Sequence, residues 1–287
     1  MPSTVGRARV IDLHCHSTAS DGHLAPTDVI RHAAEIGLSA VALTDHDTLG
    51  GLLEATAAGE ALGIRVIGGC EFSVAAPWGE MHLLGYFLTP GDADIEHFLV
   101  DARTDRSRRA REMVTRLVGL GLKISYDDVA KEADGGAVGR PHVARALLRL
   151  GLVATEQAAF DKYLGRGRPC FVEKALPTLR EVADLVHAKG GIVSAAHLKW
   201  HGTRASLALL QADGLDAVET RHPSHDGEVR ATITEAAATL GLVRSGGSDW
   251  HGEFGAAAGH SMLGSQEVPD AWLDELEARR PVGTPRG

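Results

Sequence analysis

Short apolar runs recur along most of the chain, and most of them lead into polar side chains. The first begins at Val10 and reaches His14 and His16. Three further runs, SAVALTDHD, GIRVIGGCEFSV and GEMHLLGYFL, carry His46, Glu71 and His82. Apolar runs of this length, bounded by glycine and polar clusters, predict buried β-strands. Three later runs, GGIVSAAH, LDAVETRH and LVRSGGSDWH, bring the predicted strands to seven.

Helical patterns separate these strands in the two outer parts of the chain. Segments with apolar spacing typical of helices follow the first two strands and end near Gly37 and Gly63, and two more cover residues 179–189 and about 269–279. Alternation of strands and helices predicts an α/β barrel or open sheet. In such folds, polar residues gather at the carboxyl ends of the strands.

The middle of the chain follows a different pattern. Strand-like runs largely disappear between residues 91 and 177, and helical segments replace them, one of which Ser125 could cap. We therefore predict a discontinuous barrel, 10–90 and 178–280, with an inserted helical subdomain at 91–177. The basic run RTDRSRRARE is typical of a solvated helix face. Arg140 and His142 instead open a helix, where free backbone N–H groups favour an anion.

Composition excludes several classes of protein. With 287 residues and 44% hydrophobic content, the chain can bury a core. A net charge of -9 argues against a surface that binds long nucleic acid. Three cysteines without CxxC spacing argue against a disulfide framework or a zinc ribbon. The beginning of the chain lacks the apolar core of a signal peptide, and no stretch is apolar enough to span a membrane. We expect a cytoplasmic protein, and nothing in the sequence indicates a protein partner.

The residues near the predicted strand ends are of metal-ligating types. Nine such groups are too many for one ion, and imidazole together with carboxylate suits Zn, Mn or Fe. In a strand, residues two apart point to the same face, so His14 and His16 aim at one point. A carboxylate such as Glu71 can bridge two ions, and clustered ions can hold a hydroxide that attacks phosphorus. The nine candidates are His14, His16, Asp21, His46, Glu71, His82, His197, Asp249 and His251.

The motifs HCHSTASDG, TDHD, CEFS, MHLLGY and GSDWHG together resemble the polymerase and histidinol phosphatase (PHP) family of metal-dependent phosphoesterases. The resemblance extends from Ile11 to about Gly252. Within that family, the spacing of the motifs and the helical insert with GRPH are similar to the bacterial nucleoside 3',5'-bisphosphate phosphatases. Some members of that subfamily also trim short RNA from the 5' end. The resemblance implies a distorted seven-stranded β/α barrel, in agreement with the seven predicted strands.

The same resemblance implies two or three divalent metal ions, with the family's ligands carried over residue by residue. It assigns His14, His16, Glu71 and Asp249 to the first ion, Glu71, His82 and His197 to the second, and Asp21, His46 and His251 to the third. Arg140 and His142 match an Arg-x-His motif and would bind phosphate, His142 also being a possible acid for the leaving alcohol. Leu198 replaces the proline that usually follows the ligand His197, which affects the expected substrate preference more than the chemistry.

The expected activity is hydrolysis of the 3'-phosphate of a small nucleoside 3',5'-bisphosphate by a metal-bridging hydroxide. A 5'-3' exoribonuclease acting on short RNA is the alternative, and an amidohydrolase or a non-catalytic barrel is less favoured. His222 and His225 are candidates for substrate contacts or for loop structure. Trp78 and Trp250 are candidates for stacking on a base or for packing.

Overall fold

The computed structural model describes residues 9–136, 138–252 and 261–281. Its strands form one curved sheet in the order β7-β6-β5-β4-β3-β2-β1-β8. The strands are β1 (Val10–Cys15), β2 (Ala40–Leu43), β3 (Arg65–Ala76), β4 (Gly79–Tyr86), β5 (Ile192–Ala195), β6 (Ala217–Arg221), β7 (Val243–Gly246) and β8 (Val268–Pro269). The seven predicted strands are all present. The eighth is a two-residue strand antiparallel to β1, at a position where the sequence predicted the start of the last helix.

Backbone contacts between the two ends of the sheet nearly close it into a barrel. Cys15, at the end of β1, forms a parallel bridge with Trp250, which follows β7. His16 N donates to Trp250 O at 2.9 Å, and Asp249 N donates to His14 O at 2.8 Å. The predicted α/β barrel is therefore confirmed. Its closure also brings the ends of β1 and β7 side by side, although more than two hundred residues separate them in the sequence.

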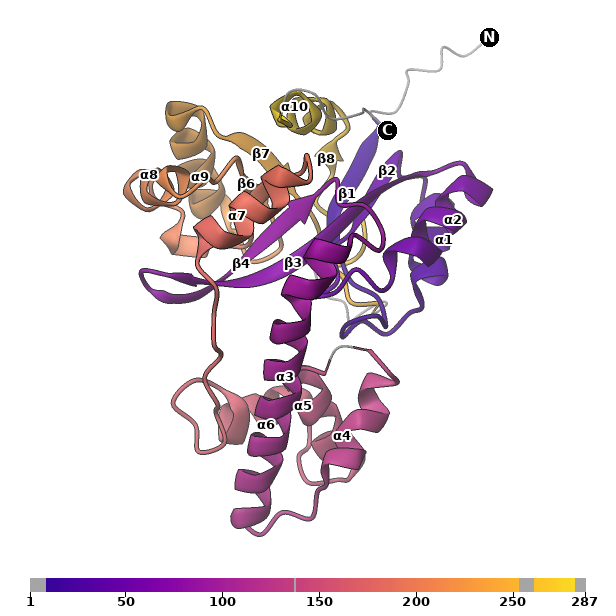
Figure 1. The fold of residues 1–287 in the computed structure, drawn as a ribbon, viewed down its shortest axis with the longest axis vertical. Helices are drawn as coiled ribbons and strands as arrows, with labels where there is room; N and C mark the ends of the chain where they lie inside the picture. Colours follow the sequence, from indigo (N-terminus) through magenta and orange to yellow (C-terminus); the bar gives the residue numbers. More distant parts are fainter. Residues whose placement is uncertain (1–8, 137, 253–260, 282–287) are drawn as a thin grey trace.

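Strands β3 and β4 depart from a simple repeat of strand and helix. They form an antiparallel hairpin from Gly69 opposite Tyr86 to Ala76 opposite Gly79, and β4 is also antiparallel to β5. The link between the two strands holds only Pro77 and Trp78, which is too short for the crossover that parallel strands need. The other neighbours from β1 to β3 and from β5 to β7 are parallel. The tip of this hairpin projects beyond the sheet (Figure 1).

Helices cover both flanks of the barrel, and a helical lobe extends from one end (Figure 1). Helices α1 and α2 lie on one flank and α7, α8 and α9 on the other, while α3 runs from the sheet into the lobe. The helices are α1 (Pro26–Glu35), α2 (Leu52–Leu62), α3 (Ala93–Gly119), α4 (Tyr126–Ala133), α5 (Arg140–Arg149), α6 (Glu156–Ala159), α7 (Leu179–Ala188), α8 (Arg204–Ala212), α9 (Gly227–Leu240) and α10 (Ala271–Arg279), with the short helices η1 (Phe160–Leu164) and η2 (Lys199–His201).

Local sequence accounts for several of these helix boundaries. Ser125 caps α4 through a capping box with Asp128, as predicted, and Thr178 caps α7 in the same way with Glu181. Helix α2 begins at Leu52 and ends, as expected, before Gly63. Two glycines precede it, and glycine disfavours the helical conformation.

The lobe has a hydrophobic core of its own. Residues from Ala110 to Val172 form one apolar cluster, separate from the clusters that line and surround the barrel. Helix α3 takes part in both, since Ile95 and Leu99 pack with the barrel and Met113 and Leu117 pack in the lobe. We propose the division at 91–177 as the domain organisation, with α3 as the rigid link between the two cores.

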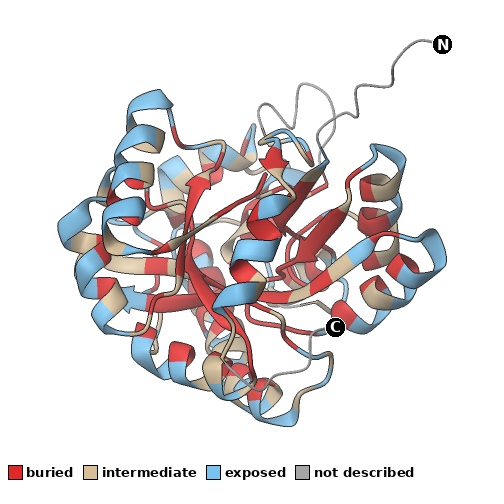
Figure 2. Cartoon of the chain, turned by 90° about the horizontal axis from the view of Figure 1, so that it is seen from above, coloured by how far each residue is buried: buried red, intermediate tan, exposed pale blue. Residues whose placement is uncertain are grey.

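The strands are the most buried part of the molecule, as Figure 2 shows. All four residues of β2 are buried, which is typical of a parallel strand covered on both faces. Within 9–136, 138–252 and 261–281, no helix is long and apolar enough to cross a membrane.

Candidate metal centre

The nine ligand positions predicted from the sequence converge on one end of the barrel. Each lies in a strand or in the segment that follows one: His14 in β1, His16 and Asp21 after it, His46 after β2, Glu71 in β3, His82 in β4, His197 after β5, and Asp249 and His251 after β7. Four of the nine, His14, His16, Asp21 and Glu71, are buried, and the other five are partly buried. Eight of them contribute imidazole nitrogens or carboxylate oxygens to overlapping groups, and the ligand atoms within each group lie within 4.8 Å of one another. The ninth, His197, lies with its Nε2 3.1 Å from Glu71 Oε1.

Glu71 lies at the centre of the cluster and is fully buried. Its Oε2 lies 3.3 Å from His14 Nε2, 3.2 Å from His16 Nε2 and 3.1 Å from His46 Nδ1. Its Oε1 lies 2.6 Å from His82 Nδ1 and 3.1 Å from His197 Nε2. One carboxylate thus faces five imidazoles, three on one oxygen and two on the other, which is the arrangement expected of a group that bridges two ions.

A second grouping surrounds Asp21. Its Oδ1 lies 3.3 Å from His251 Nε2, and its Oδ2 lies 3.8 Å from His46 Nε2. The ring of His251 also stacks on that of His16 at 4.2 Å between centroids, so the group around Asp21 is in direct contact with the group around Glu71. The loop that carries Asp21 is fastened by Asp45, which accepts hydrogen bonds from Ser17 and Ser20.

Several buried polar atoms at the centre are placed to bind a metal ion and form no hydrogen bonds with one another. Among the described residues, His14 Nε2, His16 Nδ1, His46 Nδ1, His82 Nδ1 and Glu71 Oε2 are buried without a hydrogen-bond partner. All but His16 Nδ1 nevertheless lie within 3.3 Å of an opposing ligand atom without forming a hydrogen bond to it. Lone pairs that converge without bonding are expected where a cation completes the site, and the mixed donor set suits Zn, Mn or Fe.

Charges in the cluster shift its histidines in opposite directions. Burial alone would lower the pKa of His16, but Asp249 and Glu71 outweigh it and raise the pKa to about 10. Glu71 likewise raises the pKa of His82 to about 9 despite burial. Burial dominates at His46 and lowers its pKa to about 3. Because metals bind only unprotonated imidazole, metal loading must release protons from His16 and His82.

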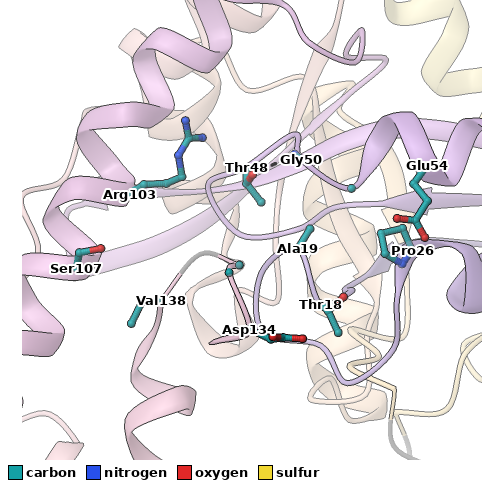
Figure 3. Close-up of a pocket in the computed structure, with 13 residues that line it drawn as sticks. Thr18, Ala19, Pro26, Thr48, Gly50, Glu54, Arg103, Ser107, Asp134 and Val138 are labelled. Atoms are coloured by element: carbon teal, nitrogen blue, oxygen red, sulfur yellow. Dashed lines mark hydrogen bonds between the residues drawn. The ribbon is translucent and has the colours of Figure 1, made fainter. Parts of the chain in front are cut away.

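A cavity of about 190 Å³ lies directly above this cluster. Asp21, His46 and His82 line it on the side of the cluster. Helix α3, helix α5 and the segment between η1 and α7 supply four cations, Arg106, Arg109, Arg140 and Lys174. The described chain also contains a larger cavity of about 550 Å³, shown in Figure 3, between the loops at Thr18, Gly50 and Asp134. None of the nine ligand positions lines that larger cavity, so its size alone does not make it the functional site.

Comparison with known proteins shows the family to which a chain with this arrangement belongs. The PHP domain profile matches residues 12–194, which is more than half of the chain. The chain belongs to the PHP domain family. It is 35% identical to the 3',5'-nucleoside bisphosphate phosphatase of Chromobacterium violaceum over 94% of this chain and 97% of that protein. It is 34% identical to a 5'-3' exoribonuclease of Haemophilus influenzae over 84% of this chain and 89% of that protein.

A solved structure supports the same membership. The chain superposes on a Bifidobacterium adolescentis protein, assigned as a metal-dependent phosphoesterase, with a TM-score of 0.86 and 32% identity. The match covers 95% of this chain and 97% of that one. The PHP centre described above is therefore part of a fold that both chains share over nearly their whole length, and the helical lobe belongs to the shared part.

A buried carboxylate behind the PHP centre positions two of its histidines. Glu219 Oε1 lies 3.0 Å from His14 Nδ1, and its Oε2 accepts the backbone N–H of His197 at 2.8 Å. Histidine ligands usually donate their second ring nitrogen to such a group, which fixes the tautomer and the orientation of the ring. His14 would therefore present Nε2 to a metal, in agreement with the direction of that atom toward Glu71.

Replacing Glu219 with glutamine should weaken metal binding about 10- to 100-fold, the usual effect of losing the outer partner of a ligand. The amide keeps the shape of the side chain but removes the charge that holds the proton on His14 Nδ1. Titration of the metal-free protein with Mn²⁺ measures the change. Glu228→Gln, at the start of α9, is the matched control. Unchanged affinity in Glu219→Gln would show that the fold alone orients His14.

His222 and His225, predicted as substrate contacts, lie beside the PHP centre and outside the cavity that Arg106, Arg109, Arg140 and Lys174 line. His222 Nε2 is 3.4 Å from Asp249 Oδ2, and His225 Nε2 accepts the backbone N–H of Lys199 at 3.2 Å. Both line a polar cavity with Arg221 and Arg230 that does not include Arg140. A contact with substrate stays a prediction for these two residues, and the bond from Lys199 also gives His225 a structural task.

Arg140 and His142, the other predicted substrate contacts, point to different places. Arg140 lines the cation-rich cavity, 5.5 Å above the ring of Phe171. His142 is buried, and its Nδ1 accepts the backbone N–H of Gly139 in the capping box of α5. Burial, followed by the charge of Arg145, lowers the pKa of His142 to about 4. It is neutral at pH 7, and this geometry favours a role in fixing the start of α5 beside Arg140.

Arg106, Arg109 and Lys174 are not among the residues that the sequence predicts for the site. The run containing the two arginines is typical of a solvated helix face, yet Arg106 is 8% and Arg109 only 3% exposed. Both continue the stripe of α3 that buries Ile95 and Leu99 before them and Met113 after them, with the spacing of one helix face. That spacing was readable from the sequence. Lys174 lies in an irregular segment, and no pattern in the sequence indicated its position.

Proposed function

We propose that this PHP protein is a metal-dependent phosphatase that removes the 3'-phosphate of nucleoside 3',5'-bisphosphates and leaves nucleoside 5'-monophosphates. The observation that carries the proposal is the combination of a cluster of imidazoles and carboxylates with buried or partly buried cations above it, which carboxylates neutralise only in part. The name of the Chromobacterium violaceum relative supports the choice of substrate.

The cations above the cluster differ in whether a carboxylate neutralises them. Arg106 forms a buried pair with Asp47 at 2.6 Å, and Lys174 pairs with Glu80. Within the described chain, Arg109 and Arg140 form no ion pair with a carboxylate. Burial, and then the charge of Arg140, lowers the pKa of Arg109 to about 10. A buried guanidinium group and a partly buried one that repel each other fit an incoming dianion such as a phosphate monoester.

The metal-type side chains and the cations would have different roles in the reaction. The nine-residue cluster would hold two or three divalent ions, of which Mn, Fe and Zn fit the donors. Such ions lower the pKa of a bound water and withdraw charge from phosphoryl oxygens. Arg140 and Arg109 would bind the oxygens of phosphate from the side of the lobe and stabilise the charge that develops on them. Asp47 and Glu80 would hold Arg106 and Lys174 in place at the edge of the cavity.

Hydrolysis of short RNA from the 5' end is the second candidate, because the Haemophilus influenzae relative is named a 5'-3' exoribonuclease. It would use the same centre and cations. An amidohydrolase fits less well, because a neutral amide does not need four cations to bind it, whereas a phosphate ester carries negative charge that they complement.

Phosphate release from adenosine 3',5'-bisphosphate tests the proposal, with AMP, 3'-AMP, a generic aryl phosphate and a short 5'-phosphorylated RNA alongside. The protein is purified, stripped and reloaded with Mn²⁺. We expect preferred hydrolysis of the bisphosphate with AMP as the product. Faster release of mononucleotides from the RNA would favour the exoribonuclease. No turnover of any phosphate ester by fully loaded protein would refute both.

A further inference from the structure

A second cavity opens from the metal centre in another direction. It has a volume of about 370 Å³, within the usual range for small-molecule sites. His82 and His197 line it where it meets the metal centre, and Arg140 lines both this cavity and the cation-rich one. The two cavities therefore branch from one junction at His82 and Arg140, next to the proposed reaction centre.

The two branches differ in chemistry. The first is lined by four cations, as described above. The second has an aromatic wall formed by Trp78 and His201, whose rings lie parallel at 4.5 Å between centroids and an interplanar angle of 5°. Met81 and Leu198 add apolar surface, and the cations Arg166 and Lys199 also line this branch. Its carboxylate, Glu80, is paired with Lys174.

The aromatic wall is assembled from segments that are distant in the sequence. Trp78 occupies the two-residue turn of the β3–β4 hairpin, and His201 ends η2, which follows the ligand His197. From the lobe, Arg166 reaches the same hairpin: a side chain at Gly79, which has a φ of 119°, would lie 2.8 Å from its guanidinium. The hairpin, the segment after β5 and the lobe thus meet around this branch.

We propose that this branch is a nucleobase subsite, with the base of the substrate packed against the Trp78–His201 pair. The inference rests on the proposed function and extends it to substrate selection. A nucleoside bisphosphate carries one base beside its phosphates, and the structure offers one branch with an aromatic wall beside one branch lined by four cations. Aromatic side chains bind any base through its π face, so the subsite selects nucleotides over other phosphate esters without strong preference among bases.

The other exposed or candidate tryptophans do not compete for this role. Trp250 is 1% exposed and packs in the barrel core. Trp200 is 72% exposed and precedes His201 in η2, but it does not line the cavity. Trp200 is therefore a suitable control, since it has the same side chain in the same segment outside the proposed subsite.

The test compares kcat/KM for adenosine 3',5'-bisphosphate with that for methyl ribofuranoside 3,5-bisphosphate, which lacks the base. The wild type should prefer the nucleotide. Trp78→Ala should lower kcat/KM about 10- to 100-fold for the nucleotide and leave the base-free ester nearly unchanged. Trp78→Phe should keep most of the preference, and Trp200→Ala all of it. His201→Ala repeats the test with the other ring if Trp78→Ala does not fold.

Each other outcome has a distinct meaning. Equal loss on both substrates in Trp78→Ala and His201→Ala, or equal rates on both in the wild type, overturns the subsite while the phosphatase stands. Loss of the preference in Trp200→Ala would place the base elsewhere on η2 and also overturns it. Failure of the loaded wild type to hydrolyse either bisphosphate refutes the proposed function and this inference with it.

Discussion

Replacing Glu71 with glutamine should abolish most of the phosphatase activity, with a fall in kcat on the order of 10³-fold or more. Loss of an outer partner of a ligand typically costs 10- to 100-fold, and Glu71 is itself at the centre of the cluster. Its two oxygens lie within 3.3 Å of five imidazoles. Glutamine presents one oxygen and one NH₂ group, so it cannot bridge two ions through two oxygens.

The same substitution should reduce the metal content of the purified protein, which elemental analysis measures directly. Glu60→Gln is the matched control, because Glu60 is exposed on α2. Circular dichroism shows whether the variant folds, since removal of a buried charge among histidines also changes stability. A folded Glu71→Gln protein with full metal content and wild-type turnover would contradict the bridging role.

Replacing Arg140 with alanine should lower kcat/KM for the bisphosphate by about 10²- to 10³-fold while the metal content stays near that of the wild type. Removing one preorganised group that stabilises developing charge typically has an effect of this size. Arg140 has no carboxylate partner in an ion pair within the described chain. Its removal therefore leaves no buried charge unpaired, and the fold should tolerate it.

Arg149→Ala, in the last turn of the same helix, provides the control because Arg149 pairs with Glu132 on the lobe surface. Turnover and metal content should be measured on the same preparations. Loss of metal in Arg140→Ala would assign the residue to the integrity of the centre instead of to substrate. Unchanged kinetics would leave Arg109 as the main phosphate-binding group.

Part of the candidate centre was predictable because strand order and residue spacing carry the information. Strand residues two apart share a face, which placed His14 and His16 together, and the carboxyl ends of parallel strands meet at one edge. That rule predicts that His46 and Asp249 lie at the same end of the barrel. The structure does place all nine predicted positions there, with Glu71 between them.

Other features depended on packing that the sequence pattern does not show. His142 and Arg140 are two residues apart at the start of one helix, yet one caps that helix and the other lines the cavity. From the sequence, Trp78 and Trp250 are both candidates for stacking on a base or for packing. In the structure Trp250 is buried in the core, whereas Trp78 lines a cavity. Neither distinction follows from residue type, since each depends on which surface a neighbouring element covers.

The sequence by itself determined the barrel, the helical insertion and the set of metal-type side chains, because these depend on hydrophobic periodicity and on spacing within single elements. Only the tertiary structure decided the pairing of β3 with β4, the burial of Arg106 and Arg109 over the centre and the stacking of Trp78 on His201. These features join segments far apart in the chain. Their geometry is set by how the lobe, the hairpin and the barrel pack together, and no local pattern encodes it.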